Sequence, residues 1–191
     1  MFLLFGVVSF GQFSLAGNGV TIECPTAVPG ATGIVGGKTY TALTSTTLMA
    51  KSKADADWDC ICTSLVDNMD GLFEDATTFN QDISSWDTSN VIRMNTMFKN
   101  ATAFNQNIGS WTVSKVQYMG SMFRGASNFN QDIGGWNTVN VTSMAYMFSE
   151  TPFNQDIGNW NTSKNRNMYR MFYGASAFDN NGQPLNWDTS K

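Results

Sequence analysis

The chain of 191 residues contains no histidine, three cysteines and four prolines, and only 11 of its residues are lysine or arginine. Without histidine, it lacks the side chain that most often serves as a general base or a metal ligand. Its net charge of −4 and its scattered cationic residues disfavour a nucleic-acid partner, which requires a clustered basic surface. These absences favour a non-enzymatic protein that uses no metal ion and no cofactor.

The apolar runs are also too short to form a transmembrane helix, which takes about 20 apolar residues. Residues 2–16 are apolar and end in Ser14-Leu15-Ala16, which is typical of a cleavage site for export. We therefore expect a signal peptide at residues 1–16 and an extracellular or cell-surface location. A buried N-terminal strand is the alternative interpretation of this segment.

The cysteines Cys24, Cys60 and Cys62 all precede residue 66. In an exported protein we expect a disulfide from Cys24 to either Cys60 or Cys62, which leaves one thiol free. A zinc site would need a fourth ligand in a chain without histidine, so we expect no metal site.

Residues 17–65 are rich in glycine, threonine, serine and alanine, and they differ in composition from the rest of the chain. Gly36-Gly37, between two short segments of alternating character, predicts a hairpin turn. A helix is predicted from Ser45 to about Lys53. We interpret residues 17–65 as an N-terminal capping region that shields the first unit of a repeat array.

Residues 66–191 comprise five repeats of 24–27 residues. Their consensus is V-x-x-M-x-x-M-F-x-x-A-x-x-F-N-Q-x-I-x-x-W-x-T-S. The first methionine of the pattern recurs at intervals of 25, 25, 25 and 24 residues, at Met69, Met94, Met119, Met144 and Met168. Self-similarity at this period is typical of units that bury their apolar side by stacking on their neighbours.

Two spacings coexist within a repeat. Val91, Met94, Met97 and Phe98 are spaced as on one face of a short helix, and residues 108–113 have the spacing of a short strand. The sequence therefore predicts an α/β solenoid of leucine-rich-repeat-like coils, each with one short strand and one short helix, preceded by the small N-terminal cap.

The segment from Val91 to Phe98, followed by Phe104-Asn105-Gln106 and Trp111, resembles a known repeat. It is similar to that of the BspA-like leucine-rich-repeat surface proteins, in particular the Mycoplasma-lipoprotein type of about 25 residues. The resemblance extends over residues 66–191. It implies a secreted or surface-displayed module for adhesion or protein recognition, with no catalytic residues.

Outward positions beside the tryptophans are the expected binding surface, because they vary among repeats while the core positions do not. They are Asp87, Thr112, Asn137, Asn161 and Asp188 on one side of the tryptophans, and Ser85, Ser110, Asn159 and Asn186 on the other. Small polar side chains rarely dominate a tight interface. We therefore expect weak, multivalent binding of a protein or glycan at a cell surface.

Two other functions remain open, namely an extracellular glycan-active enzyme domain and a structural spacer in a longer surface protein. The last repeat would present an apolar end to solvent. We therefore also expect the array to continue or the chain to self-associate at its C-terminal end.

Overall fold

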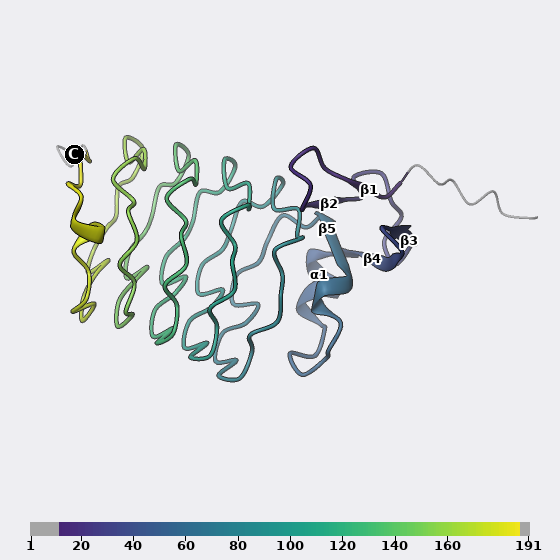
Figure 1. The fold of residues 1–191 in the computed structure, drawn as a ribbon, viewed down its shortest axis with the longest axis horizontal. Coiled ribbons are helices and arrows are strands. Elements are labelled where there is room, and N and C mark those ends of the chain that lie inside the picture. Colours follow the sequence, from purple (N-terminus) through teal and green to yellow (C-terminus); the bar gives the residue numbers. More distant parts are fainter. Residues whose placement is uncertain (1–11, 188–191) are drawn as a thin grey trace, which may run out of the picture.

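The computed structural model describes residues 12–187. Figure 1 shows an N-terminal region and a stack of repeats next to each other along the long axis of the molecule. The N-terminal region, residues 12–65, carries all the labelled strands. The repeats follow as five windings laid one on the next, at residues 66–90, 91–115, 116–140, 141–164 and 165–187. Residues 1–11 of the expected signal peptide lie outside the described residues.

Five short strands form two sheets in the N-terminal region. β1 (Ser14–Leu15) pairs antiparallel with β2 (Ile22–Glu23). The second sheet has the order β3-β4-β5 and consists of β3 (Thr32–Val35), β4 (Lys38–Thr44) and β5 (Ile61–Leu65). β5 lies parallel to β4, so the chain between them crosses over through α1 (Ser45–Met49) and the 3-10 helix η1 (Trp58–Cys60).

The predicted hairpin is confirmed. β3 and β4 are antiparallel, and the turn residues Gly36 and Gly37 have φ angles of 59° and 82°. Only glycine adopts such angles at no steric cost, and this turn matches the twist of the strands. The predicted helix is also present from Ser45, where Thr44 forms a capping box with Thr47, but it ends at Met49 rather than near Lys53.

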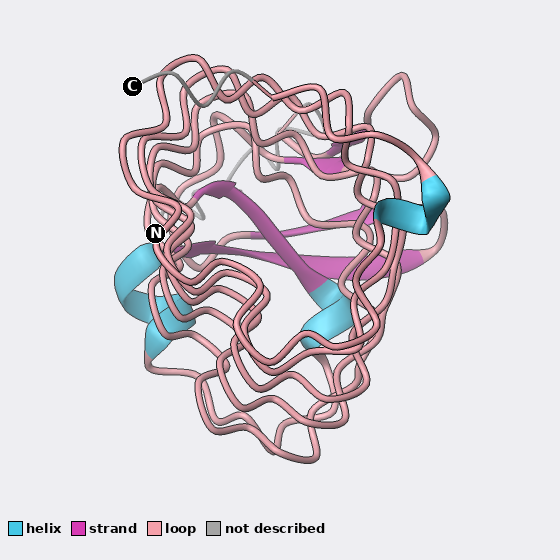
Figure 2. Cartoon of the chain, turned by 90° about the vertical axis from the view of Figure 1, so that its left-hand side faces the viewer, coloured by secondary structure: helices cyan, strands magenta, loops and turns pink. Residues whose placement is uncertain are grey.

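The windings correct the predicted fold class. Between residues 66 and 179 the chain forms turns and irregular segments, drawn as loop in Figure 2, and the one helical element in the described windings is η2 (Asn180–Gly182). The α/β solenoid of leucine-rich-repeat-like coils, each with a short strand and a short helix, was therefore the wrong prediction. The strands lie in the two small sheets of the N-terminal region.

Left-handed residues explain why no helix forms. We number each winding from its first core residue, which is valine in four windings and Asn165 in the fifth. Positions 6 and 10 have positive φ in every winding, at Gly71, Thr96, Ser121, Tyr146 and Arg170 and at Asp75, Asn100, Gly125, Glu150 and Gly174. A right-handed helix requires negative φ throughout, so position 6 interrupts it within the methionine pattern and position 10 interrupts it two residues after the pattern.

Hydrogen bonds between windings take the place of helical ones. The backbone N–H groups at positions 4, 6, 8 and 10 of the second winding donate to the carbonyls at positions 3, 5, 7 and 9 of the third, at 2.8–2.9 Å. Isolated parallel bridges follow the same column, from Asn68 through Arg93, Tyr118 and Ser143 to Asn167. Each winding thus satisfies the backbone polar groups of its neighbour, which buried backbone requires.

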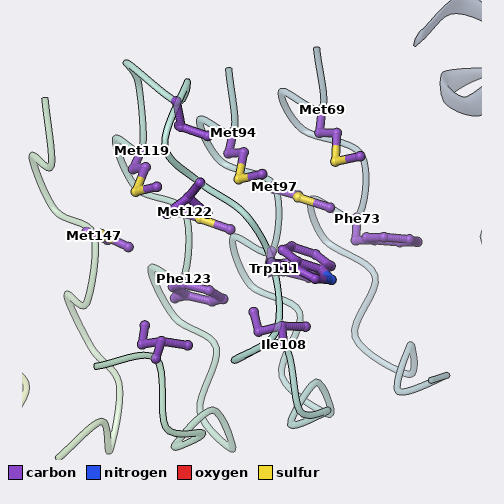
Figure 3. Packing of buried hydrophobic residues seen from close by; sticks show 14 of the residues in the cluster. Met69, Phe73, Met94, Met97, Ile108, Trp111, Met119, Met122, Phe123 and Met147 are labelled. Carbon is purple, nitrogen blue, oxygen red and sulfur yellow. The ribbon is translucent and has the colours of Figure 1, made fainter. Parts of the chain in front are cut away.

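One apolar core runs through the stack into the N-terminal region, and Figure 3 shows part of it. Val91, Met94, Met97 and Phe98 are fully buried, so the predicted inward set is confirmed although the helix is not. Aromatic rings stack from winding to winding, with Phe98 and Phe123 at 5.6 Å between centroids. Trp58 of the N-terminal region lies in the same core.

Candidate functional site

The N-terminal region contains a disulfide and a free thiol. Cys24, which follows β2, is bonded to Cys62 in β5, and Cys60 is free and half-buried. Burial raises the pKa of the Cys60 thiol, and the hydrogen bond that it donates to Asp59 raises it further. The thiolate is the nucleophilic form of cysteine, so this environment opposes catalytic use of Cys60.

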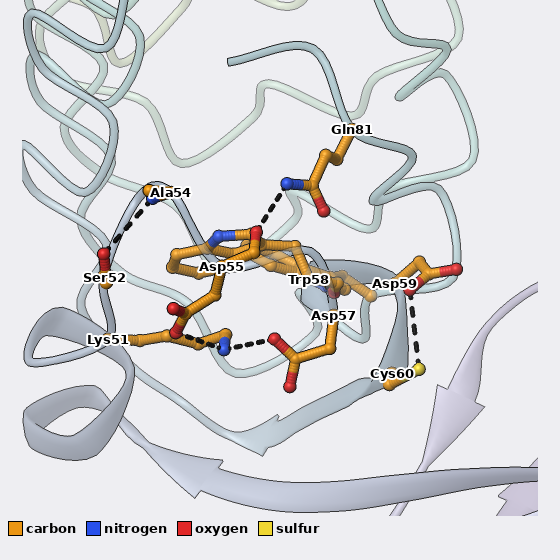
Figure 4. A network of polar contacts seen from close by, with 10 residues as sticks. Lys51, Ser52, Ala54, Asp55, Asp57, Trp58, Asp59, Cys60 and Gln81 are labelled. Carbon is orange, nitrogen blue, oxygen red and sulfur yellow. Dashed lines mark hydrogen bonds and ion pairs between the residues drawn. The ribbon is translucent and has the colours of Figure 1, made fainter. Parts of the chain in front are cut away.

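Lys51 is the centre of a polar network, shown in Figure 4. Its Nζ lies 2.8 Å from Asp55 Oδ2, 2.5 Å from Asp57 Oδ1 and 5.4 Å from the centroid of the Trp58 ring. Burial lowers the pKa of Lys51, but its hydrogen bonds to the two carboxylates outweigh this effect and raise it. The lysine therefore stays protonated, so it serves as a structural cation and not as a base.

A pocket of about 230 Å³ adjoins this network and is lined by Thr41, Leu43, Thr47, Lys51, Asp57, Cys60 and Ile61. Lys51 and Asp57 are engaged with each other, and Cys60 bonds to Asp59, so the pocket holds no activated nucleophile. Over residues 12–187, no group of three or more Cys, Asp or Glu side chains is arranged to hold a metal ion.

Asp87, one of the expected binding residues, is only 6% exposed. Its carboxylate accepts hydrogen bonds from Ser64 Oγ and from the Ser89 N–H, and its carbonyl accepts one from Thr63 Oγ1 at 2.9 Å. The carbonyl of Ser85 accepts a hydrogen bond from the Ile22 N–H at 2.8 Å. These two residues join the N-terminal region to the first winding.

The other expected residues beside the tryptophans form an exposed polar strip that we call the Trp flank. It consists of Ser110, Thr112, Asn137, Asn159, Asn161 and Asn186, while Asp188 lies outside the described residues. Several members bond to nearby backbone: Asn161 Oδ1 accepts the Ser163 N–H at 3.0 Å, and Ser110 Oγ donates to the Ser84 carbonyl at 3.2 Å. The strip is solvent-accessible but offers no large side chain.

The Asn-Gln pair of the repeat is structural. Asn105 Oδ1 accepts the Asn130 N–H at 3.0 Å, and Gln131 Nε2 donates to the Asn105 carbonyl at 2.9 Å. In the same way, Asn80 Oδ1 accepts the Asn105 N–H, Asn130 Oδ1 accepts the Asn154 N–H, and Asn154 Oδ1 accepts the Asp179 N–H. This polar column therefore fixes the register of the windings.

A second outward surface has a very different composition. We call it the Arg/Tyr face, and it consists of the outward residues at positions 2–10 of the windings. It holds every arginine of the chain and every tyrosine except Tyr40, namely Arg93, Tyr118, Arg124, Tyr146, Arg166, Tyr169, Arg170 and Tyr173. Tyr169 and Tyr173 are 57% and 55% exposed.

Contacts within a winding and between neighbouring windings link residues of this face. The Arg93 guanidinium lies 4.9 Å from the Tyr118 ring centroid, and the Tyr146 and Tyr169 rings meet edge to face at 5.4 Å. Arg170 lies between two exposed tyrosines, 5.2 Å from the Tyr169 centroid and 4.9 Å from the Tyr173 centroid. Such cation–π contacts restrict the motion of long, exposed side chains.

The sequence pattern alone does not reveal this face. The tyrosines and arginines stand at positions 2, 3, 5, 6 and 9 in different windings, so they form no column when the repeats are aligned. They become neighbours only because the windings stack in register. Their confinement to the variable positions of V-x-x-M-x-x-M-F-x-x is the signal that could have identified them.

Stacked windings with an extended Arg/Tyr face define a repeat protein whose outer surface is available for contact. The family described as "Mycoplasma protein of unknown function, DUF285" matches residues 44–152 and 113–191, and the chain belongs to this family. The two matches overlap within the windings, as a repeated unit requires. No curated protein and no solved structure matches the chain. Among the described residues, no helix has the length and apolarity to cross a membrane.

Proposed function

We propose that the protein is a non-enzymatic, secreted or cell-surface recognition module that acts in adhesion and binds its partner through the Arg/Tyr face. One observation carries the proposal. Every arginine and all but one tyrosine lie on one outward surface, and the Trp flank has neither. Tyrosine and arginine are among the residues most enriched at the energetic centres of interfaces.

The architecture supports a role in contact. The core fixes the windings rigidly, so the side chains of the Arg/Tyr face are held in a regular array. An array of this kind suits repeated weak contacts with a protein or a glycan, whose combined strength exceeds that of any single contact. The resemblance of the repeat to BspA-like surface proteins also supports display outside the cell.

A pair of triple variants tests which outward surface binds. The first carries Tyr169→Ala, Arg170→Ala and Tyr173→Ala, and the second, on the Trp flank, carries Thr112→Ala, Asn137→Ala and Asn161→Ala. Surface plasmon resonance would measure their binding to immobilised fibronectin, heparin, dextran and the chain itself. For any probe that binds, we expect the first triple to raise Kd at least about tenfold, since hot-spot truncations commonly cost more than 1.4 kcal/mol.

The Trp-flank triple should change the same Kd less than about twofold, because small rim side chains contribute little. Both triples replace three outward side chains, and thermal unfolding would check that both remain folded. Binding that the Trp-flank triple abolishes, but that the Arg/Tyr triple leaves intact, would contradict the proposal.

A further inference from the structure

The two ends of the Arg/Tyr face carry opposite charges that form no ion pair within residues 12–187. The first winding presents Asp67 and Asp75, and no lysine or arginine of the described residues forms an ion pair with either. Asp67 accepts a hydrogen bond from Ser45 Oγ, and Asp75 accepts one from Asn100 Nδ2. Both donors are neutral, so neither balances the charge of a carboxylate.

The fifth winding presents the opposite sign. Arg166 and Arg170 are exposed, and within residues 12–187 no carboxylate pairs with either guanidinium. The arginine of the second winding, Arg93, is bonded to Asp70 at 2.7 Å. Unpaired charge on this face is therefore concentrated at its two ends, negative at the first winding and positive at the fifth.

The second and fourth windings also carry charges of opposite sign. The second winding carries Arg93 and Lys99 on this face, and the fourth carries the exposed Glu150. When the order of the windings is reversed, the first winding meets the fifth and the second meets the fourth, each with opposite charge, and the third winding meets its own copy. The face is complementary to a copy of itself turned end to end.

We propose, building on the proposed function, that the partner of the Arg/Tyr face is a second copy of this chain, bound face to face with its windings in antiparallel order. A two-fold axis along the third winding produces this arrangement and makes the contact isologous. The axis reverses the order of the windings but keeps each position number. Asp67 of one copy then faces Arg166 of the other, because both occupy position 2.

The same register pairs further groups across the interface. Asp70 faces Tyr169 at position 5, and Glu74 faces Tyr173 at position 9. Both tyrosines are more than half exposed in the single chain, and their hydroxyls can donate to the facing carboxylates. Aromatic side chains flanked by complementary charges form the usual pattern of a specific interface.

The third winding lies on the axis, where Arg124 of each copy meets its equivalent. Glu150 Oε2 lies 3.8 Å from Arg124 Nε in the same chain and offsets this repulsion. An acidic polymer would be a poorer partner for the whole face. It would be attracted to the fifth winding but repelled by Asp67, Asp70, Glu74 and Asp75 of the first.

A charge exchange tests the proposed register in the full chain. Sedimentation equilibrium of the unchanged protein should show dimers that dissociate as salt is raised, because exposed charge pairs are screened. Arg166→Asp alone and Asp67→Arg alone should each raise the dimer Kd at least about tenfold, through two repulsive pairs per dimer. An equimolar mixture of the two variants restores both pairs and should bring Kd back to within about threefold of the original.

Lys115→Asp is the matched control, because it makes the same charge change at an exposed residue outside positions 2–10. It should leave dimerisation unchanged. Asp67→Arg suits the fold, since the fifth winding already carries arginine at this position. A second measurement does not depend on charge: in a Cys60→Ser background, Asp67→Cys and Arg166→Cys chains should cross-link to each other, but not each to itself.

A protein that stays monomeric at millimolar concentration would overturn the inference, and so would a mixture that fails to restore dimers. Equal weakening by Lys115→Asp would also overturn it. The same measurements distinguish a failure of this inference from a failure of the proposed function. If the chain is monomeric but the Arg/Tyr triple still loses binding to fibronectin or heparin, then only the identity of the partner is wrong. If the triple affects neither kind of binding, both proposals are wrong.

Discussion

The N-terminal region and the windings satisfy their backbone polar groups in different ways. In the N-terminal region, five strands pair in two sheets, and a disulfide joins β5 to the chain that follows β2. The windings use turns, left-handed residues and hydrogen bonds to the next winding. A strict repeat can therefore replace regular secondary structure, because each winding presents the same backbone carbonyl acceptors at the same positions.

The difference extends to the side chains. Ion pairs such as those of Lys38 with Asp59 and of Lys51 with Asp57 support the N-terminal region. The windings also contain ion pairs, such as that of Arg93 with Asp70, but these lie on their outer surface. Stacked rings and amide columns support the windings, where Trp136 and Trp160 lie 6.3 Å apart and nearly parallel. We therefore expect the two regions to respond to different perturbations.

The largest expected effect is on the windings. Trp136→Ala should lower the free energy of unfolding by about 3–5 kcal/mol, because it leaves a cavity in a packed core. Trp136 is 3% exposed, and its Nε1 donates to the Ile108 carbonyl at 3.2 Å. Urea denaturation would measure the loss. Tyr169→Ala, at a 57% exposed aromatic, is the control, and an equal loss there would contradict the role given to burial.

The second-largest expected loss of stability is in the N-terminal region. Replacing Cys24 and Cys62 by alanine should cost about 2–4 kcal/mol, because the bond closes a long loop and restricts the unfolded chain. The two cysteines are 38 residues apart. Cys60→Ser removes a thiol without removing a cross-link, so it should cost much less. Equal denaturation midpoints for the two variants would show that the disulfide does not stabilise this region.

Two adjacent glycines test how closely the windings approach each other. A Cβ at Gly134 would collide with the backbone carbonyl of Asp156 in the next winding, whereas a Cβ at Gly135 would meet nothing within 4 Å. Gly134→Ala should therefore destabilise the protein by about 1–3 kcal/mol, the usual cost of overpacking. Gly135→Ala should be nearly neutral in the same denaturation experiment. The reverse order would mean that the windings can separate freely.

The sequence predicted what is buried better than how the chain is folded. The spacing of Val91, Met94, Met97 and Phe98 correctly placed all four in the core. It could not exclude turns, because Thr96 at position 6 gives no sign of its φ of 53°, and left-handed backbone is unusual for a β-branched residue. Gly36-Gly37 was easier to interpret, since two glycines in succession mark a positive-φ turn.

The candidate site could be predicted only in part. The residues of the Trp flank are exposed, as their outward assignment predicted, but the burial of Asp87 depends on Ser64, which lies in β5 and far away in sequence. The Arg/Tyr face depends on contacts between successive windings, such as that of Arg124 with the Tyr146 ring. These contacts arise from the register of stacking, which the composition of a single repeat does not contain.

The smallest expected effect is a difference between the two regions in how their stability depends on acid pH. The hydrogen bond from Lys51 lowers the pKa of Asp57, and that from Lys38 lowers the pKa of Asp59, below their ordinary value of 3.8. The unfolded chain therefore binds protons more readily, so this contribution to stability is present above pH 3.8 and is lost as the pH falls through the lower, folded pKa values.

Both carboxylates are substantially exposed, so the loss should stay below about 1 kcal/mol. Urea denaturation between pH 6 and pH 2 would measure it. Lys38→Met and Lys51→Met should each flatten the acid dependence, whereas Lys115→Met, which removes the same charge from a winding, should not. An unchanged acid dependence in the Lys38→Met and Lys51→Met variants would assign the acid sensitivity to other carboxylates and remove this distinction between the regions.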